Sequence, residues 1–239
     1  PDGDLQLFRF HTNGIASGNT LEEAVLHALF EDIERDAWSI AEFRDMTNGD
    51  IIVDDEDSVP AKLISKFADQ GIEIHLKDLT SDIGVPTIGA AADDVRTRDP
   101  EMLTIGVGTH LNPAITEVAQ SRATHKHGAK INAQLQKVTQ NMGYERIKEV
   151  NHMWFGESRR KIKLSEIPDR STDDVLDDIE IVLGSLMDAG FDSVIAVDLT
   201  RPELGVPVVR MIVPGLEVST MDPEREGDRL RGMWPPIRA

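Results

Sequence analysis

Acidic side chains recur along one edge of a predicted helix near the start of the chain. On a helical wheel of about 100° per residue, Glu23, Glu31 and Glu34 fall within about 80° of one another. Apolar residues fill the adjoining arc, so this acidic edge borders the face that the helix buries. Carboxylates one or two turns apart repel each other unless a cation lies among them, and Mg²⁺ prefers oxygen ligands. The spacing therefore predicts a metal site formed by these three glutamates.

The residues just before this helix favour anion binding. Gly18 and Asn19 precede the predicted helix start, where free backbone N–H groups and the helix dipole attract phosphate. Simpler interpretations stay open at this point. Glu23 fits a capping box with Thr20, three residues earlier, and Glu34 with Arg35 fits ordinary surface charge.

The elements that position these residues follow from periodicity and from capping and turn signals. Helical spacing of apolar residues runs from the capping box to Ala37, and the remaining segments alternate between helical and extended patterns. The sequence predicts helices over 60–70, after Pro113 and over 175–186, and strands over 72–79, 88–92, 103–108, 194–199 and 207–213. We therefore expect an α/β fold of the mixed α+β type, with a mixed sheet flanked by helices.

Composition excludes several classes of protein. The 239 residues are 40% hydrophobic, enough to bury a substantial core, and they contain no cysteine, which excludes disulfides, thiolate metal sites and cysteine nucleophiles. A formal net charge of −18 opposes binding to nucleic acid. No apolar run is long enough to span a membrane. We expect a cytoplasmic protein without nucleic-acid or membrane partners.

Three motifs in chain order resemble those of the YcaO family, most closely its archaeal members. The first combines residues 12–20 with Glu23-Ala24 and residues 31–37, the second combines 106–113 with 116–122, and the third covers 207–217. The resemblance implies a YcaO-like fold. It also implies an ATP- and Mg²⁺-dependent enzyme that activates a peptide backbone amide by phosphorylating its oxygen, giving azolines, amidines or thioamides.

The resemblance also implies roles for particular residues, although it assigns none as catalytic. Carboxylates would hold Mg²⁺, and an arginine would meet phosphate oxygens. The implied contacts to ATP and Mg²⁺ are Asn19, Glu23, Glu31, Glu34, Arg35, Glu117, Gln120 and Arg122.

The chain departs from the family pattern in two places. It begins at Pro1 and lacks the upstream part of the family's ATP site, so we expect residues 1–239 to be a single catalytic domain without its N-terminal portion, inactive by itself. Only three residues separate Pro113 from Glu117, where the family has a longer, arginine-bearing segment. This difference puts the contacts from the second motif in question.

The carboxyl end favours one product among those of the family. It lacks the alternating-proline tail of azoline-forming members, which indicates thioamide formation, with a glycine of methyl-coenzyme M reductase as the candidate substrate. The alternatives are an azoline-forming cyclodehydratase and a non-catalytic accessory protein for methylthiolation of a ribosomal protein. The expected partners are a peptide or protein substrate, a protein that presents substrate or sulfur, and a second copy in a homodimer.

Overall fold

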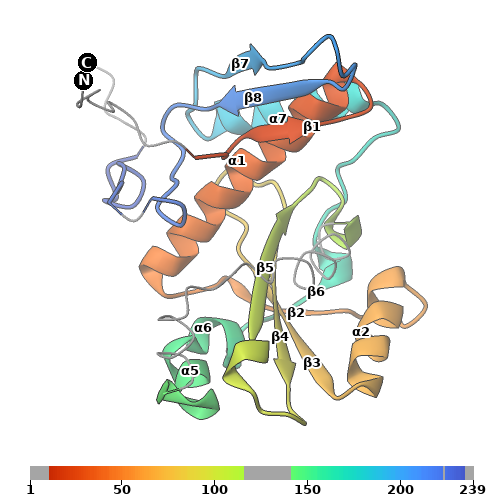
Figure 1. Cartoon of the computed structure of the whole chain (residues 1–239), viewed down its shortest axis with the longest axis vertical. Helices are drawn as coiled ribbons and strands as arrows, with labels where there is room; N and C mark the ends of the chain where they lie inside the picture. The colour runs from red at the N-terminus through yellow and green to blue at the C-terminus, as the bar shows by residue number, and fades with distance from the viewer. Residues whose placement is uncertain (1–10, 116–140, 223, 235–239) are drawn as a thin grey trace. The chain divides into compact units, whose positions relative to one another are not determined.

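The computed structural model describes residues 11–115, 141–222 and 224–234, and it divides into two compact units (Figure 1). The first unit combines residues 1–42 with 173–239, and the second unit is the continuous stretch 43–172. The expectation of a single catalytic domain stays a prediction.

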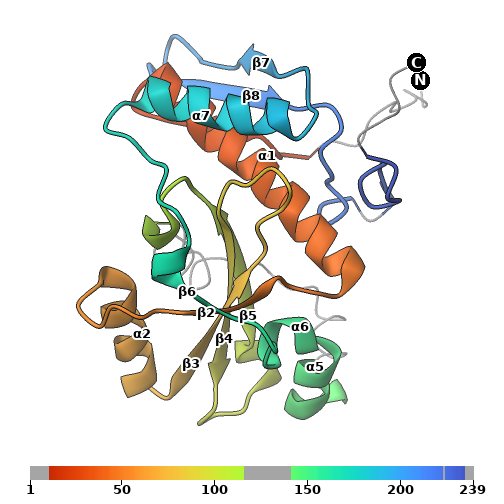
Figure 2. The ribbon, with the colours of Figure 1, turned by 180° about the vertical axis from the view of Figure 1, so that it is seen from behind.

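The first unit contains a three-stranded antiparallel sheet and two helices. Its elements are β1 (Ile15–Ser17), most of α1 (Leu21–Arg44), α7 (Val175–Asp188), β7 (Ile195–Asp198) and β8 (Val208–Ile212). The strand order is β1-β8-β7, so a strand near the start of the chain pairs with one near its end. Figures 1 and 2 show α7 against one face of this sheet.

The second unit is built on a five-stranded mixed sheet of order β5-β4-β3-β2-β6. All neighbouring strands are antiparallel except β2 and β6, which are parallel. Its elements are β2 (Gly49–Ile52), α2 (Val59–Asp69), β3 (Ile72–Asp78), β4 (Thr87–Asp94), the 3-10 helix η1 (Pro100–Met102), β5 (Thr104–Thr109), α5 (Tyr144–Val150), α6 (His152–Phe155), β6 (Lys161–Lys163) and the 3-10 helix η2 (Leu164–Glu166).

Capping residues explain where the regular helices begin and end. The Ser58 hydroxyl accepts a hydrogen bond from Ala61 N at the start of α2, and Gly71, with φ of 74°, follows its end. Asp174 caps α7 by accepting from Leu176 N, and Gly190 follows that helix with φ of 95°. These local signals confirm the predicted helices over 60–70 and 175–186.

The mixed α+β class and the five predicted strands are confirmed. The sequence did not predict β1, β2, β6, α5 or α6, because none of these short stretches carries an apolar run as long as those that marked β7 and β8. Of the helix predicted after Pro113, only residues 113–115 lie within the described part. None of the described helices combines the length and apolar content needed to cross a membrane.

A close contact between α6 and β4 fixes one corner of the second unit. Trp154 is buried, and a Cβ atom at Gly89 would lie 2.4 Å from Cζ3 of its ring. The glycine is therefore required by space, because any side chain would have to displace a buried indole.

We predict that Gly89→Ala lowers the free energy of unfolding by about 1–3 kcal/mol, since the ring and the strand must separate. Urea denaturation measures the change. Gly184→Ala in α7 is the matched control, because a Cβ there meets nothing within 4 Å and alanine favours the helix. A Gly89→Ala chain as stable as the wild type would contradict this packing.

Candidate functional site

The start of α1 holds two of the predicted site residues together. Asn19 donates two hydrogen bonds to Oε2 of Glu23, from its backbone N and from Nδ2, both at 2.8 Å. Glu23 N donates to the Thr20 hydroxyl at 3.2 Å. Half of the predicted capping box is therefore present, while the Glu23 carboxylate accepts from the backbone N of Asn19 instead of that of Thr20. The Glu23 carboxylate thus bends back toward the residue before the helix.

The middle of α1 brings three more predicted residues together. The Arg35 guanidinium lies 3.6 Å from both Glu31 Oε1 and Glu34 Oε1. The side chains of Glu31, Glu34 and Arg35 are only 24%, 15% and 20% exposed. Arg35 Nε is buried and has no hydrogen-bond partner among the described residues. The guanidinium therefore keeps one N–H without a hydrogen-bond partner beside two carboxylates. Carboxylate oxygens are ligands that Mg²⁺ prefers, and a guanidinium donates hydrogen bonds to phosphate.

Burial changes the protonation of one of these carboxylates. Removal from water, opposed by Arg35 and assisted by the nearby Glu31, raises the pKa of Glu34 to about 8. At neutral pH the Glu34 carboxyl is therefore largely protonated without a cation. A divalent ion would reverse this balance by favouring the ionised form.

The two groups on α1 are separated along the helix axis. Glu23 and Glu31 are eight residues apart, which is about 12 Å at about 1.5 Å per residue. Because Glu23 turns back toward Asn19, and because Mg²⁺ binds oxygens at about 2.1 Å, one ion does not reach both in this arrangement. The structure brings together Asn19 with Glu23, and Glu31 with Glu34 and Arg35. The predicted contacts Glu117, Gln120 and Arg122 lie outside the described residues.

Comparison with known proteins matches this chain to a family model described as YcaO cyclodehydratase, ATP- and Mg²⁺-binding, over residues 1–217. The chain belongs to the YcaO family. It is 49% identical over 238 residues to an uncharacterized protein of Methanothermobacter thermautotrophicus, covering 97% of this chain and 62% of that protein.

Solved structures of the YcaO fold agree with this membership. The structure of YcaO from Methanopyrus kandleri bound with AMPPCP and Mg²⁺ has a TM-score of 0.74 at 28% identity, over 91% of this chain and 58% of that one. A heterocyclase in complex with substrate and cofactor has a TM-score of 0.76 at 25% identity, over 91% and 30%. The chain thus spans less than two thirds of the length of these relatives.

The asparagine and first glycine of the opening YcaO motif serve the fold. Asn13 Nδ2 donates to Asp32 Oδ1 at 2.8 Å, which links the turn before β1 to α1. Gly14 adopts φ of 73°, and a Cβ there would lie 2.3 Å from the Met211 carbonyl oxygen and 2.7 Å from Asp32 Oδ1. Only glycine lets the turn lie this close to β8 and to a buried carboxylate.

A second buried acid of α1 forms an ion pair. Asp36 accepts two hydrogen bonds from the Arg229 guanidinium, at 2.8 and 2.9 Å, and a third from Glu217 N at 2.9 Å. The Glu217 carboxylate in turn accepts from the backbone N of Gly227, Arg229 and Leu230. The glutamate that closes the third YcaO motif thus folds the chain around Arg229.

Asp32 and Asp36 had no predicted role, although their positions on the helical wheel carried a signal. Asp36 falls at about 220° from Glu23, inside the arc of apolar residues, and Asp32 falls at about 180°, on its border. A carboxylate on a buried face needs a cation, a donor or a proton. The wheel could therefore have predicted that partners exist, but not that they come from residues 13 and 229.

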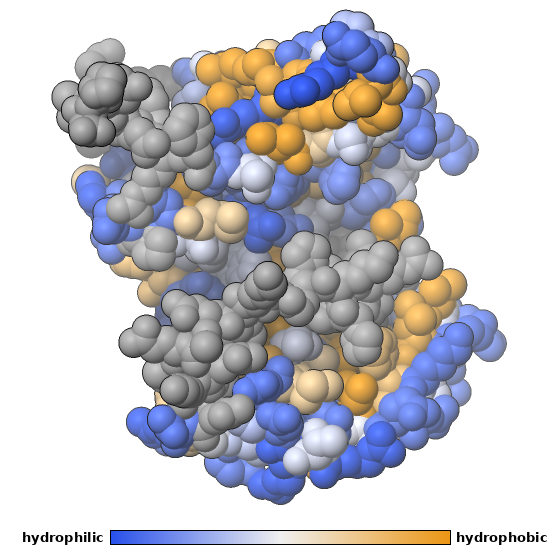
Figure 3. Space-filling view, in the orientation of Figure 1, coloured by the Kyte–Doolittle hydropathy of each residue, from blue (hydrophilic) through white to orange (hydrophobic). Residues whose placement is uncertain are grey.

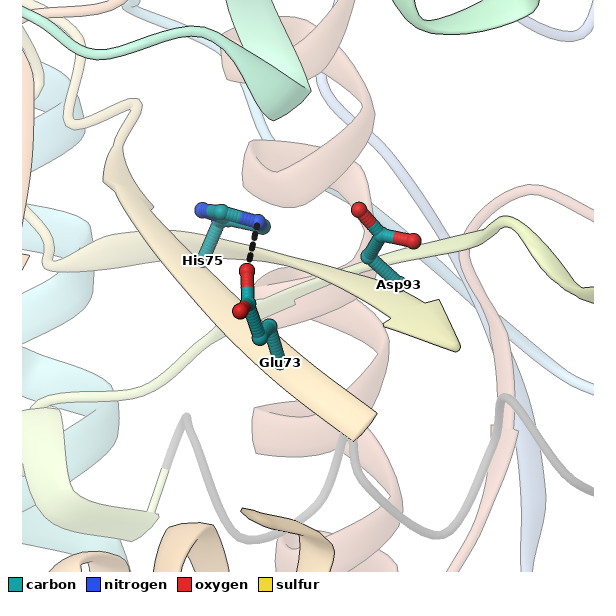
Figure 4. Close-up of side chains that lie close together, drawn as sticks. All are labelled: Glu73, His75 and Asp93. Carbon is teal, nitrogen blue, oxygen red and sulfur yellow. Dashed lines mark ion pairs between the residues drawn. The ribbon is translucent and has the colours of Figure 1, made fainter. Parts of the chain in front are cut away.

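A separate group of possible metal ligands lies in the second unit. Among the described residues, Glu73, His75 and Asp93 offer ligand atoms within 4.8 Å of one another (Figure 4). Both Asp93 oxygens, however, already accept hydrogen bonds at 2.5 Å, from the Tyr144 hydroxyl and from Lys148 Nζ. Lys148 thus balances the Asp93 charge, and the network fastens α5 to β4.

The environment of Asp32 predicts an unusual dependence of the free energy of unfolding on pH. Burial, with the neighbouring Glu31, raises the pKa of Asp32 to about 8 from 3.8. The folded chain therefore holds a proton that the unfolded chain releases, so the free energy of unfolding falls as pH rises from about 4 to about 8. A difference of one pKa unit corresponds to about 1.4 kcal/mol.

We expect Asp32→Asn to flatten this decrease, because the amide does not titrate and still accepts from Asn13. Urea denaturation at several pH values between 5 and 8.5 measures the free energy of unfolding. The decrease with pH that remains in the variant comes from Glu34. Asp54→Asn is the control, since the hydrogen bond from Ser165 keeps the pKa of Asp54 below its usual value and outside this range. An unchanged slope in Asp32→Asn would contradict the raised pKa.

Proposed function

We propose that this chain is the nucleotide-binding part of an enzyme that activates a peptide backbone amide by ATP- and Mg²⁺-dependent phosphorylation of the amide oxygen. One observation carries the proposal: the group of Glu31, Glu34 and Arg35 on α1, in a chain of an ATP- and Mg²⁺-binding family. The chain spans only part of its relatives, so the activity is proposed for the longer protein.

The charges in this group suit phosphoryl transfer. When both carboxyls are ionised, Glu31 and Glu34 carry two negative charges against one on Arg35, which leaves room for a cation. Mg²⁺ would supply neutralisation of the phosphate oxygens during transfer. Arg35 would donate from its terminal nitrogens to those oxygens and would orient the phosphates toward the amide.

The separation along α1 supports two metal positions. Glu31 and Glu34 would share one ion, and Glu23, held by Asn19, would bind a second near the helix start. A triphosphate lying along the helix could contact both ions. Glu117, Gln120 and Arg122 remain proposed contacts from the second motif.

For the product we propose a thioamide, on the resemblance to archaeal members. The identity to the Methanothermobacter protein and the similarity to the Methanopyrus structure support an archaeal type of YcaO protein. The candidate substrate is a glycine of methyl-coenzyme M reductase, presented with sulfide by a partner protein. Azoline formation is the second candidate, supported by the similarity to the heterocyclase complex. Both routes begin with the same activated amide.

We predict that Mg²⁺ with a non-hydrolysable ATP analogue raises the melting temperature of the chain by about 5–10 °C at a hundredfold excess over Kd. Glu31→Gln and Glu34→Gln should abolish the part of this increase that requires Mg²⁺, because an amide cannot replace the lost charge. Glu22→Gln is the matched control, since Glu22 is exposed on the first turn beside Glu23. Equal shifts in all three variants would remove Glu31 and Glu34 from the metal site.

The raised pKa of Glu34 predicts that a proton is released when Mg²⁺ binds. Because its pKa is about 8 in the nucleotide-free chain, the ion must displace a proton at neutral pH. Affinity for Mg²⁺ and nucleotide should therefore rise with pH up to about 8 and then level off. Calorimetry at pH 7 in two buffers of different ionisation enthalpy measures the released proton, which Glu34→Gln should eliminate. Binding of equal affinity and without proton release at pH 7 and pH 8.5 would exclude Glu34 as a ligand.

The reaction is tested with a peptide whose amide oxygen is a heavy isotope. Phosphorylation of that oxygen predicts that the isotope appears in the released phosphate. With sulfide present, mass spectrometry should detect replacement of oxygen by sulfur, whereas loss of water without sulfur uptake would favour the azoline. The assay uses the full-length Methanothermobacter relative beside this chain. Partner binding without ATP consumption in the longer protein would favour the accessory role.

A further inference from the structure

One face of the three-stranded sheet in the first unit is apolar, and no described residue covers it. Registered pairs in an antiparallel sheet share a face, so Ile195, Val197, Arg210 and Ile212 lie together, with Ile15 beside Arg210 on β1. Ile195, Val197 and Ile212 are 48%, 39% and 40% exposed. Figure 3 shows hydrophobic side chains gathered over β7 and β8, at the top of the view.

The opposite face of the same sheet is covered at β1 and β8, whereas β7 is exposed on both faces. Ala16, Val209 and Met211 alternate with the residues above and are buried, on the side where Figures 1 and 2 place α7. An antiparallel sheet with one face in water normally carries polar side chains there. Strand β8 is instead apolar on both faces apart from Arg210, a pattern typical of a strand that is covered on both sides.

Arg210 adds a chemical requirement to this face. Its Nε is buried and donates no hydrogen bond within the described residues. Asp32 is near enough to act on Arg210 electrostatically, yet no hydrogen bond joins it to this Nε. A guanidinium in the centre of an apolar face is stabilised by a carboxylate brought by whatever covers it.

We propose that this face is the docking surface for an apolar, acid-bearing segment from the part of the YcaO family's length that this chain does not contain. The Methanothermobacter relative has 38% of its length outside the match, because 62% is covered. The free edge of β7 allows the segment to continue the sheet as well as cover it.

A second copy fits this face less well. Two copies packed face to face would bring two Arg210 side chains into one apolar interface without a carboxylate. Each chain also carries a net charge of −18, which opposes association. The predicted homodimer would therefore use another surface.

The absence of cysteine allows a direct test by thiol labelling. Val197→Cys and Ile212→Cys report on the face, and Met187→Cys in α7 and Val59→Cys in α2 are exposed apolar controls. Each is placed in the 239-residue chain and in a longer protein that joins the remaining Methanothermobacter sequence to it as in that relative. We expect labelling at Val197 and Ile212 to slow by about tenfold or more in the longer protein, and the controls to stay within about twofold.

Several outcomes would overturn the proposal. One is unchanged labelling at Val197 and Ile212 in a longer protein that melts cooperatively. Another is protection in the short chain that grows with its concentration, which would make a second copy the occupant. If the joined protein does not melt cooperatively, hydrogen exchange of the strand matching β7 in the natural Methanothermobacter protein decides, and exchange as fast as in the short chain rejects the docking.

The acidic partner of Arg210 has its own readout. Arg210→Gln should lower the melting temperature of the longer protein by several degrees more than that of the short chain, because only the longer protein supplies the carboxylate. An equal change in both would reject the acidic character of the segment, even where labelling supports its docking.

Discussion

Four carboxylates and one guanidinium lie within six consecutive residues of α1, from Glu31 to Asp36. A helix that is buried on one side retains such charge only where each acid finds a counter-charge, a donor or a proton. Asp36 pairs with Arg229, and Asp32 holds a proton and a hydrogen bond from Asn13. Glu31 and Glu34 share Arg35. When Glu31 and Glu34 are both ionised, Arg35 balances only one of their two charges. The need of this helix for a further cation is therefore concentrated at these two glutamates.

This distribution separates structural acids from candidate binding acids on the same helix. The buried acids Asp32 and Asp36 accept hydrogen bonds from Asn13 and Arg229, whereas the partly exposed Glu31 and Glu34 are the acids that we propose to bind a cation. The partner of Asp36 cannot be replaced without a loss of stability, because Asp36 without Arg229 would be a buried, unpaired charge. Arg35 lies 3.6 Å from Glu31 and Glu34, a longer distance than the 2.8 Å between Arg229 and Asp36. Its side chain would therefore need to break weaker contacts to reach a phosphate.

The sequence was sufficient to predict the elements that carry strong periodicity or clear caps. The long helix α1, the helix ended by Gly71 and the strand pair β7–β8 follow from residue patterns within about fifteen residues of each element. Strands β1, β2 and β6 depend on partners far away in sequence, and Gly49–Ile52 becomes a strand because it lies between β3 and β6. The acidic edge of α1 could be predicted for the same local reason, while Asn13 and Arg229 could not. Hydrogen bonds across 19 and 193 residues leave no periodic trace.

Pairing of β1 with β8 has a consequence for the order in which the protein is made. The second unit occupies the continuous stretch 43–172, so all its strands have been synthesised once β6 leaves the ribosome. The sheet of the first unit needs Ile15 to meet Arg210, nearly two hundred residues later. During translation Asp36 of α1 therefore lacks its ion-pair partner until Arg229 emerges, and the middle of the chain can reach its native fold before the ends do.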